Sequence, residues 1–258
     1  MAKIIQRKGA HTGEPEVGIE KVPEMAKEWK PVTDLGRQVK DGKITDIDQV
    51  FDLGSPIMEA QIVDSLVPGL EEDLLLIGQA KGKFGGGQRR IFRQTQKKTK
   101  EGNKIKFTTL AVVGNRNGYV GIGIGKSKET VPSRDKAKRN ARLALIRIRR
   151  GCGSWATDAR EANSIPFAVT GKCGSCRVHL MPAPPGKGLV IERECAKVLA
   201  LAGIKDIWSR TDGQAKTKLN QVYALIDALK QLSKVKIQPG DVAKLGVIEG
   251  RLRENKLN

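Results

Sequence analysis

The strongest constraint on how this chain can fold is a block of positive charge confined to residues 81–150. The block holds 21 lysines and arginines and only three acidic residues, a net charge of +18, while the whole chain of 258 residues carries +19. So dense a surplus must stay at a surface, where it is either merely solvated or neutralised by a polyanion. Binding to phosphates is favoured because it releases the counterions condensed on a nucleic acid. The sequence therefore predicts a nucleic-acid partner.

The bulk composition excludes several other classes of protein. A hydrophobic content of 39% with only 4% aromatic residues predicts small aliphatic cores, and 258 residues suit one large or two ordinary domains. No window approaches the roughly 18 apolar residues of a membrane span, and the start of the chain has no apolar segment of signal-peptide length. We expect a cytoplasmic protein with reduced cysteines and no membrane partner.

Shifts in charge and in turn residues divide the chain into four parts. We expect an N-terminal tail and extension over residues 1–54, a basic domain over 55–155, a nearly neutral α/β domain over 156–235 and a C-terminal tail over 236–258. In the basic domain the apolar periodicity predicts a short helix beginning at Ser55-Pro56, strands at 73–79, 105–114 and 119–125, and a helix from Pro132 to Gly151. In the neutral domain it predicts strands at 166–170 and 177–180 and helices at 192–202 and 216–232.

The strand at 119–125 alternates glycine with aliphatic residues. Val120, Ile122 and Ile124 share one face and can enter a core, whereas the glycines at 121, 123 and 125 leave the other face bare. Glycine weakens the interior of a strand, so three on one face predict that something approaches the backbone closely. A helix of the same domain, RNA or the second domain could each fill that space.

The same strand ends in a sequence that resembles a phosphate-binding P-loop. That motif needs four residues between its first glycine and Gly-Lys, but Gly121 is only three residues ahead of Gly125-Lys126. Neither histidine has a nucleophilic partner at a recognisable spacing. We expect no catalytic residues, no cofactor and no small-molecule substrate, and therefore no enzyme.

The four cysteines offer one closely spaced pair, Cys173 and Cys176, with Cys152 and Cys195 further away. A structural zinc site normally has two such pairs. We therefore expect no metal, and buried small side chains instead.

Several motifs together resemble one family. Phe107–Glu129 contains a Val-rich strand, Gly-Asn-x-x-Gly, the Val-Gly-Ile-Gly strand and Gly-Lys-Ser-Lys-Glu, and a basic helix follows. With Arg149–Trp155, Gly171–Ser175, Pro182–Gly188 and Glu28–Gly36, this segment resembles the small-subunit ribosomal protein five family in its archaeal form. Lys81–Arg93 departs from the family pattern as an added basic segment.

The resemblance implies an α+β fold of two domains. The first would be an N-terminal double-stranded-RNA-binding-like α-β-β-β-α module, and the second a C-terminal α/β domain of the ribosomal protein five second-domain type with a left-handed βαβ crossover. It also implies a ribosome-bound structural constituent of the small ribosomal subunit that binds small-subunit rRNA and supports decoding accuracy. Such a protein would lie beside the channel through which mRNA enters and contact ribosomal proteins four, eight and three. A free double-stranded RNA-binding regulatory protein is the alternative.

The charge block and the family motifs together give a set of candidate RNA-binding residues. These are Lys81, Lys83, Arg89, Arg90, Lys97, Lys98, Lys100, Asn103, Lys104, Asn115, Arg116, Asn117, Lys126, Lys128, Arg134, Lys138, Arg149 and Arg150.

Overall fold

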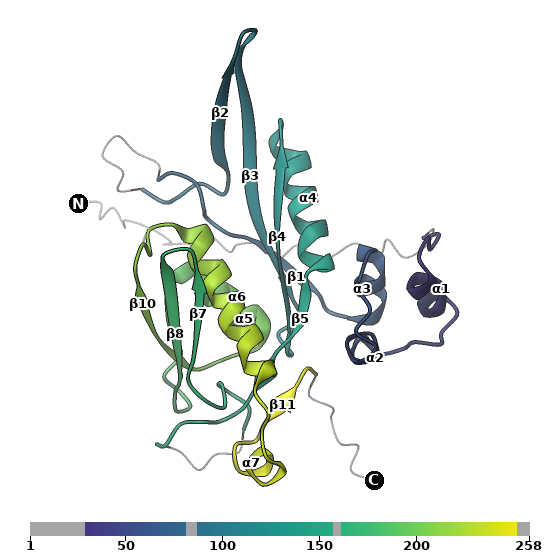
Figure 1. Cartoon of the computed structure of the whole chain (residues 1–258), viewed down its shortest axis with the longest axis vertical. Coiled ribbons are helices and arrows are strands. Elements are labelled where there is room, and N and C mark those ends of the chain that lie inside the picture. The colour runs from purple at the N-terminus through teal and green to yellow at the C-terminus, as the bar shows by residue number, and fades with distance from the viewer. Residues whose placement is uncertain (1–28, 81–86, 157–160, 252–258) are drawn as a thin grey trace, which may run out of the picture.

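Two larger sheets and the helices around them form the body of the protein (Figure 1). The computed structural model describes residues 29–80, 87–156 and 161–251. The first sheet contains β1 (Glu71–Leu74), β2 (Arg93–Thr99), β3 (Gly102–Gly114), β4 (Tyr119–Ser127) and β5 (Leu145–Arg147). The second contains β7 (Val169–Cys173), β8 (Cys176–Pro182), β9 (Leu189–Val190) and β10 (Ile207–Asp212), and β6 (Arg149–Arg150) pairs with β11 (Ile248–Glu249). The helices are α1 (Asp34–Lys40), α2 (Ile47–Asp52), α3 (Ala60–Leu66), α4 (Thr130–Leu143), α5 (Arg193–Ala202), α6 (Lys218–Lys234) and α7 (Pro239–Lys244).

The first sheet has the order β1-β3-β4-β5, and β2 shares an edge of β3 with β1. β1 pairs with residues 111–114 of β3, while β2 pairs with residues 102–108. Between β1 and β2 the chain leaves this edge of the sheet. An isolated antiparallel β-bridge pairs Ala80 with Arg89 there. β3 extends three residues beyond the N-terminal limit of the predicted strand, and β2 was not predicted as a strand at all.

Helix α4 covers the glycine face of β4. A Cβ atom at Gly123 would lie against the backbone N of Ala141 and 2.5 Å from the backbone O of Ala137. The Asn140 side-chain amide donates to the Ile124 carbonyl at 2.8 Å, and the buried Ser133 hydroxyl donates to the Gly125 carbonyl at 3.0 Å. Of the alternatives left open by the sequence, the helix of the same domain is the one confirmed.

The predicted continuation of this helix to Gly151 is wrong. α4 ends at Leu143, and residues 145–147 form β5, which pairs antiparallel with residues 119–121 of β4. Leu145 and Ile148 are buried. A tertiary partner strand therefore outweighs the local helical pattern, because it satisfies the backbone along the free edge of β4.

The second sheet has the order β7-β8-β10-β9. α5 connects the parallel strands β9 and β10 and begins at the Glu192 carboxylate, which accepts from the backbone N–H groups of the first turn. It ends at Gly203, whose φ of 84° lies in the left-handed region that favours glycine. The predicted helices at 192–202 and 216–232 are thus confirmed as α5 and α6, whereas β7 begins three residues later than predicted.

The opposite face of the first sheet is packed against the second half of the chain. Val120 and Ile122 are buried, as predicted, in one continuous core with Val198 and Leu199 of α5. The first sheet therefore lies between α4 on one face and α5 on the other, and the two halves share a core.

The N-terminal extension, which contains α1 and α2, packs together with α3 of the basic domain on the α4 side of the first sheet. Glu59, which precedes α3, connects α3 to the segment ahead of α1 through four hydrogen bonds. Its carboxylate accepts from Trp29 Nε1 at 2.7 Å, from the backbone N and the hydroxyl of Thr33 at 2.7 Å each and from Val32 N at 3.0 Å. α3 begins at Ala60, five residues after the predicted start.

Acid should release this extension before the rest of the protein unfolds. Burial raises the pKa of Glu59, but the hydrogen bonds from Thr33, Trp29 and Val32 outweigh burial and hold the pKa below its usual value. The stabilisation is therefore complete above the ordinary glutamate pKa of about 4.3 and is lost as the pH falls through the lower folded-state value. Fluorescence of Trp29, in a chain carrying Trp155→Phe and Trp208→Phe, should report this transition.

A glutamine in place of Glu59 provides the comparison. Glu59→Gln should give the released Trp29 signal at neutral pH, because an uncharged amide oxygen accepts these bonds more weakly. Glu101→Gln, at an exposed carboxylate of the β2–β3 turn, should leave the signal unchanged. An identical acid transition in the Glu59→Gln chain would contradict the assignment.

The C-terminal segment is more than a tail. Within residues 236–251, placed in the predicted C-terminal tail, α7 and β11 are formed, and β11 pairs with β6 in the register Ile248 to Arg150 and Glu249 to Arg149. The Cys152 N–H also donates to the Leu245 carbonyl at 2.7 Å. This segment therefore packs back onto the junction between the two halves.

Candidate nucleic-acid interface

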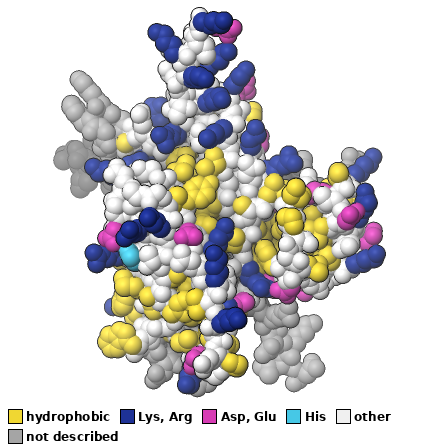
Figure 2. Space-filling model, viewed as in Figure 1, with side chains coloured by type: hydrophobic (Ala, Val, Ile, Leu, Met, Phe, Trp, Pro, Cys, Tyr) yellow, Lys and Arg dark blue, Asp and Glu magenta, His cyan; other side chains and the backbone are white. Residues whose placement is uncertain are grey.

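The β2–β3 hairpin extends away from the body of the protein (Figure 1). Every residue of β2 up to Lys98 is exposed, as is every residue of β3 from Gly102 to Lys106. Figure 2 shows Lys and Arg side chains distributed along this projection. Its exposed cations are Arg93, Lys97, Lys98, Lys100, Lys104 and Lys106.

Acidic side chains hardly compensate this charge. Lys104 pairs with Glu101 in the turn at 3.0 Å, with both side chains more than half exposed. Among the described residues, the other five cations of the hairpin have no ion pair. An exposed pair of this kind contributes little to stability. The hairpin thus presents a row of cations available to an external polyanion.

Most of the other predicted residues that the structure describes are also accessible. Arg90, Lys126 and Lys128 are exposed, while Arg89 and Arg134 are half-buried. Lys138 is half-buried and pairs with Glu72 of β1 at 2.9 Å, which ties α4 to the sheet. Lys81 and Lys83 lie outside the described residues.

The predicted contact turn at Asn115–Asn117 is engaged within the protein. The Arg116 backbone N donates to the Leu201 carbonyl at 2.8 Å, and its guanidinium pairs with Glu71. The side-chain oxygen of Asn115 accepts from the backbone N–H of Asn117, whose own side-chain oxygen accepts from Arg150. The turn therefore joins the first sheet to the end of α5.

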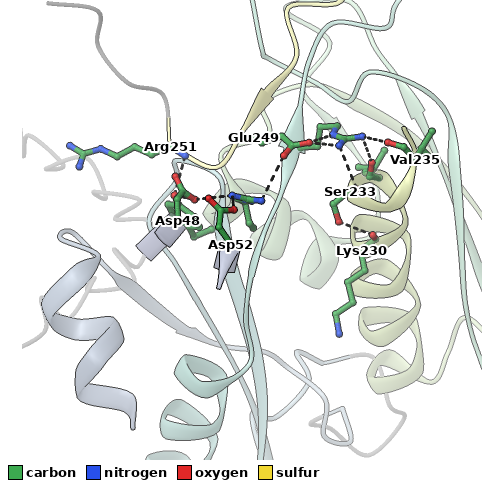
Figure 3. Close-up of polar contacts among 11 residues, drawn as sticks. Asp48, Asp52, Lys230, Ser233, Val235, Glu249 and Arg251 are labelled. Carbon is green, nitrogen blue, oxygen red and sulfur yellow. Dashed lines mark hydrogen bonds and ion pairs between the residues drawn. The ribbon is translucent and has the colours of Figure 1, made fainter. Parts of the chain in front are cut away.

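The expectation that Arg149 and Arg150 extend the exposed basic surface is wrong. Their exposed fractions are 9% and 3%. Arg149 donates to the carbonyls of Leu232 at 2.9 Å and Val235 at 2.6 Å and pairs with Glu249, so it caps the C-terminal end of α6 (Figure 3). Arg150 donates to the Gly250 carbonyl at 3.0 Å, and burial lowers the pKa of its guanidinium. Both guanidinium groups hold β11 in place.

Arg147 extends this polar network to the N-terminal extension. Its guanidinium lies 3.0 Å from Asp52 and 3.6 Å from Asp48 of α2, and 3.9 Å from Glu249 of β11 (Figure 3). The Tyr119 hydroxyl donates to Asp48 at 2.7 Å. The three arginines at 147, 149 and 150 thus fix four segments of the chain rather than a ligand.

Sequence reasoning missed four accessible cations. Arg93 and Lys106 lie on the hairpin, and Lys136 and Arg139 are exposed on α4. The alternation of Gln with Arg, Thr and Lys in Arg93-Gln-Thr-Gln-Lys97 could have identified β2 and, through its pairing with β3, Lys106. The sequence analysis assigned no strand to this segment, which contains no apolar residue.

The Gly-Lys-Ser sequence lies in a strand. Gly125, Lys126 and Ser127 all belong to β4, whereas a P-loop must be a turn that leads into a helix. Among the described residues, no three His, Cys, Asp or Glu side chains are grouped to hold a metal ion. Burial raises the pKa of the thiols of Cys176 and Cys195. Within the described ranges, every helix is too short or too polar to span a bilayer.

Comparison with known proteins finds a family match in each half of the chain. The family model of ribosomal protein S5, N-terminal domain, matches residues 91–149, and that of ribosomal protein S5, C-terminal domain, matches residues 171–245. The small ribosomal subunit protein uS5 of Nanoarchaeum equitans is 46% identical over 225 residues, which cover 87% of this chain and 96% of that protein. The chain belongs to the uS5 family. The uS5 of Methanobrevibacter smithii (46% identical, 85% of this chain and 96% of that protein) and that of Methanocaldococcus jannaschii (43%, 87% and 97%) are similarly close.

Membership of the uS5 family confirms the resemblance, its archaeal character and the mixed α+β fold with two domains. uS5 proteins are structural, which agrees with the expectation of no enzyme, and the free RNA-binding regulator finds no support. The N-terminal family match contains β2, β3, β4 and α4. The hairpin and α4 therefore both belong to the S5 N-terminal domain.

Proposed function

We propose that this chain is a structural constituent of the small ribosomal subunit and binds small-subunit rRNA through the β2–β3 hairpin. Membership of the uS5 family supports the setting, since the relatives are named for that subunit. The observation that carries the rRNA contact is the projecting row of cations, which are exposed and have almost no acidic partners in the described chain. Phosphates of RNA fit such a row by charge.

The remaining parts of the proposal follow the family. The protein acts in the cytoplasm, bound to the ribosome, beside the channel through which mRNA enters. There it contacts ribosomal proteins four, eight and three and supports decoding accuracy. The shared core and the buried arginines support a scaffold role, because they hold the hairpin and the second domain in one fixed relation.

The rRNA contact should depend steeply on salt. If six cations neutralise phosphates of helical RNA, the log–log slope of affinity against salt should be about −4 to −5. Lys97, Lys104 and Lys106 changed together to glutamine should reduce the magnitude of that slope by about 2 to 3. Filter binding of the full chain to small-subunit rRNA at graded salt measures both quantities.

The matched control removes the same charge elsewhere. Lys230, Lys234 and Lys236 are exposed in or just after α6, so their joint change to glutamine should leave the slope close to its native value.

Tagged protein should sediment with small subunits through a high-salt wash and crosslink to rRNA from the hairpin. Failure to sediment with the subunits, or equal slopes for the two triple variants, would overturn the proposal.

A further inference from the structure

The β2–β3 hairpin has two chemically different faces, because its register fixes which side chains share a side. Directly paired residues of an antiparallel ladder project to the same face. Lys97 stands opposite Lys104, Thr95 opposite Lys106 and Arg93 opposite Thr108, which in turn pairs with Lys126 of β4. These positions define the cation face, made of Arg93, Lys97, Lys104, Lys106 and Lys126.

The intervening positions define the amide face. Gln94 stands opposite Phe107, Gln96 opposite Ile105 and Lys98 opposite Asn103. This face therefore carries three side-chain amides and two apolar groups, and only Lys98 brings it a charge. Most paired cations of the hairpin therefore lie on one face, although residues 93–98 and 102–106 are exposed on both faces.

The amide face offers hydrogen bonds that the protein itself does not use. Within the described residues, the side chains of Gln94, Gln96 and Asn103 have no hydrogen-bond partner. Ile105 is 38% exposed, and the Phe107 ring stands edge-on to Phe92 with centroids 6.4 Å apart. A row of free amides beside apolar groups is thus held on a ladder of seven paired positions.

The chemistry of this face suits nucleobases better than phosphates. A side-chain amide donates and accepts at once, and Asn and Gln can bond two atoms on the edge of an adenine. In RNA, unpaired bases and the ribose 2′-hydroxyls of the shallow groove present such edges, and apolar side chains can contact the base faces. The cation face differs, because the like charges of Lys97 and Lys104 repel across the ladder and favour an anion between them.

Each face of the hairpin continues a different face of the first sheet. The cation face continues to Leu110 and Ile124, on the side that α5 covers. The amide face continues to Thr109 and Ala111, on the side that α4 covers, where Thr109 bonds Ser133 at 2.9 Å. Beyond these covers the ribbon stands clear of the body on both sides (Figure 1).

We propose that the hairpin inserts between two segments of rRNA. Its cation face neutralises phosphates of one segment, and its amide face bonds base edges and ribose hydroxyls of the other. This inference rests on the proposed rRNA contact and adds to it a second contact that is independent of charge. The two faces should therefore respond differently to salt.

Two triple variants of the full chain separate the faces. Gln94, Gln96 and Asn103 changed together to alanine should weaken binding to small-subunit rRNA at least about tenfold at every salt concentration, with an unchanged salt slope. Lys97, Lys104 and Lys106 changed together to glutamine should weaken binding mainly at low salt, with a reduced slope. All six positions are exposed, so melting temperatures close to the native value serve as the control for folding.

The outcomes distinguish this inference from the proposed function. If the amide-face variant binds with native affinity while the cation-face variant is weakened, the rRNA contact stands and the two-sided insertion is wrong. If the amide-face variant binds free rRNA normally but fails to enter small subunits, its partner is a protein, which also overturns the inference. If neither variant is weakened, the hairpin is not the rRNA site, and the proposed function fails with it.

Discussion

Replacing Gly123 with alanine should lower the free energy of unfolding by about 3 kcal/mol or more, a large effect for one methyl group. The added Cβ would meet the backbone of α4 at Ala137 and Ala141, and a helix backbone cannot move aside as a side-chain end can. The same helix is fixed by the bond from Asn140 to the Ile124 carbonyl. Urea denaturation of the full chain measures the loss.

Gly240 provides the matched control. It lies in α7, its φ is outside the left-handed region, and nothing beyond its chain neighbours and its own helix backbone is within 4 Å of the position that its Cβ would take. Gly240→Ala should be neutral or slightly stabilising, since alanine restricts the unfolded chain. A Gly123→Ala chain as stable as the Gly240→Ala chain would show that α4 does not press on the glycine face.

Replacing Arg149 with methionine should cost about 3 kcal/mol of stability. The methionine keeps much of the buried apolar stem but leaves the carbonyls of Leu232 and Val235 at the end of α6 without their donor. Glu249 is 40% exposed and can regain water, so most of the cost should come from the carbonyls. Urea denaturation and protease sensitivity after residue 235 should both report the loss of β11 pairing.

Arg139 is the comparison for Arg149, because it is an exposed arginine of α4 within the same charge block. Arg139→Met should change stability by less than about 0.5 kcal/mol. Affinity for RNA should follow the opposite order. Arg139→Met should weaken RNA binding more than Arg149→Met, which should leave the slope of affinity against salt unchanged. A reduced slope in that variant would mean that the buried guanidinium contacts phosphate after all.

Local patterns in the sequence predicted the elements whose partners are near in the chain. The glycine strand and its covering helix, together with α5 and its glycine stop, follow from periodicity and capping that a short window contains. The assignment of Val120 and Ile122 to a core was also correct. Their partners Val198 and Leu199 could not be inferred, because no local pattern reports which distant helix covers a sheet.

The failures at β5, β11, Arg149 and Arg150 have one physical cause. β5 and β11 are short strands whose pairing partners lie elsewhere in the chain, so their conformation depends on tertiary contacts. Arg149 and Arg150 were placed on the surface because charged residues are rarely buried without partners, and their partners, Glu249 and Gly250 among them, lie far away in the sequence. β2 was missed for the opposite reason, since a strand exposed on both faces has no apolar alternation.

The separation between Arg149 and Glu249 has a consequence for how the protein is made. At a synthesis rate of about 5–20 residues per second, roughly 5–20 seconds pass between the emergence of the two residues. Until α5 (Arg193–Ala202) has emerged, about halfway through that interval, the nascent chain has its basic hairpin and α4 while Leu110, Val112 and Ile122 lack their cover. A half-built core would then be exposed next to a polycation, and transiently exposed hydrophobic surface promotes aggregation. We expect the nascent chain to need protection at this stage, until the pairing of β11 with β6 closes the junction.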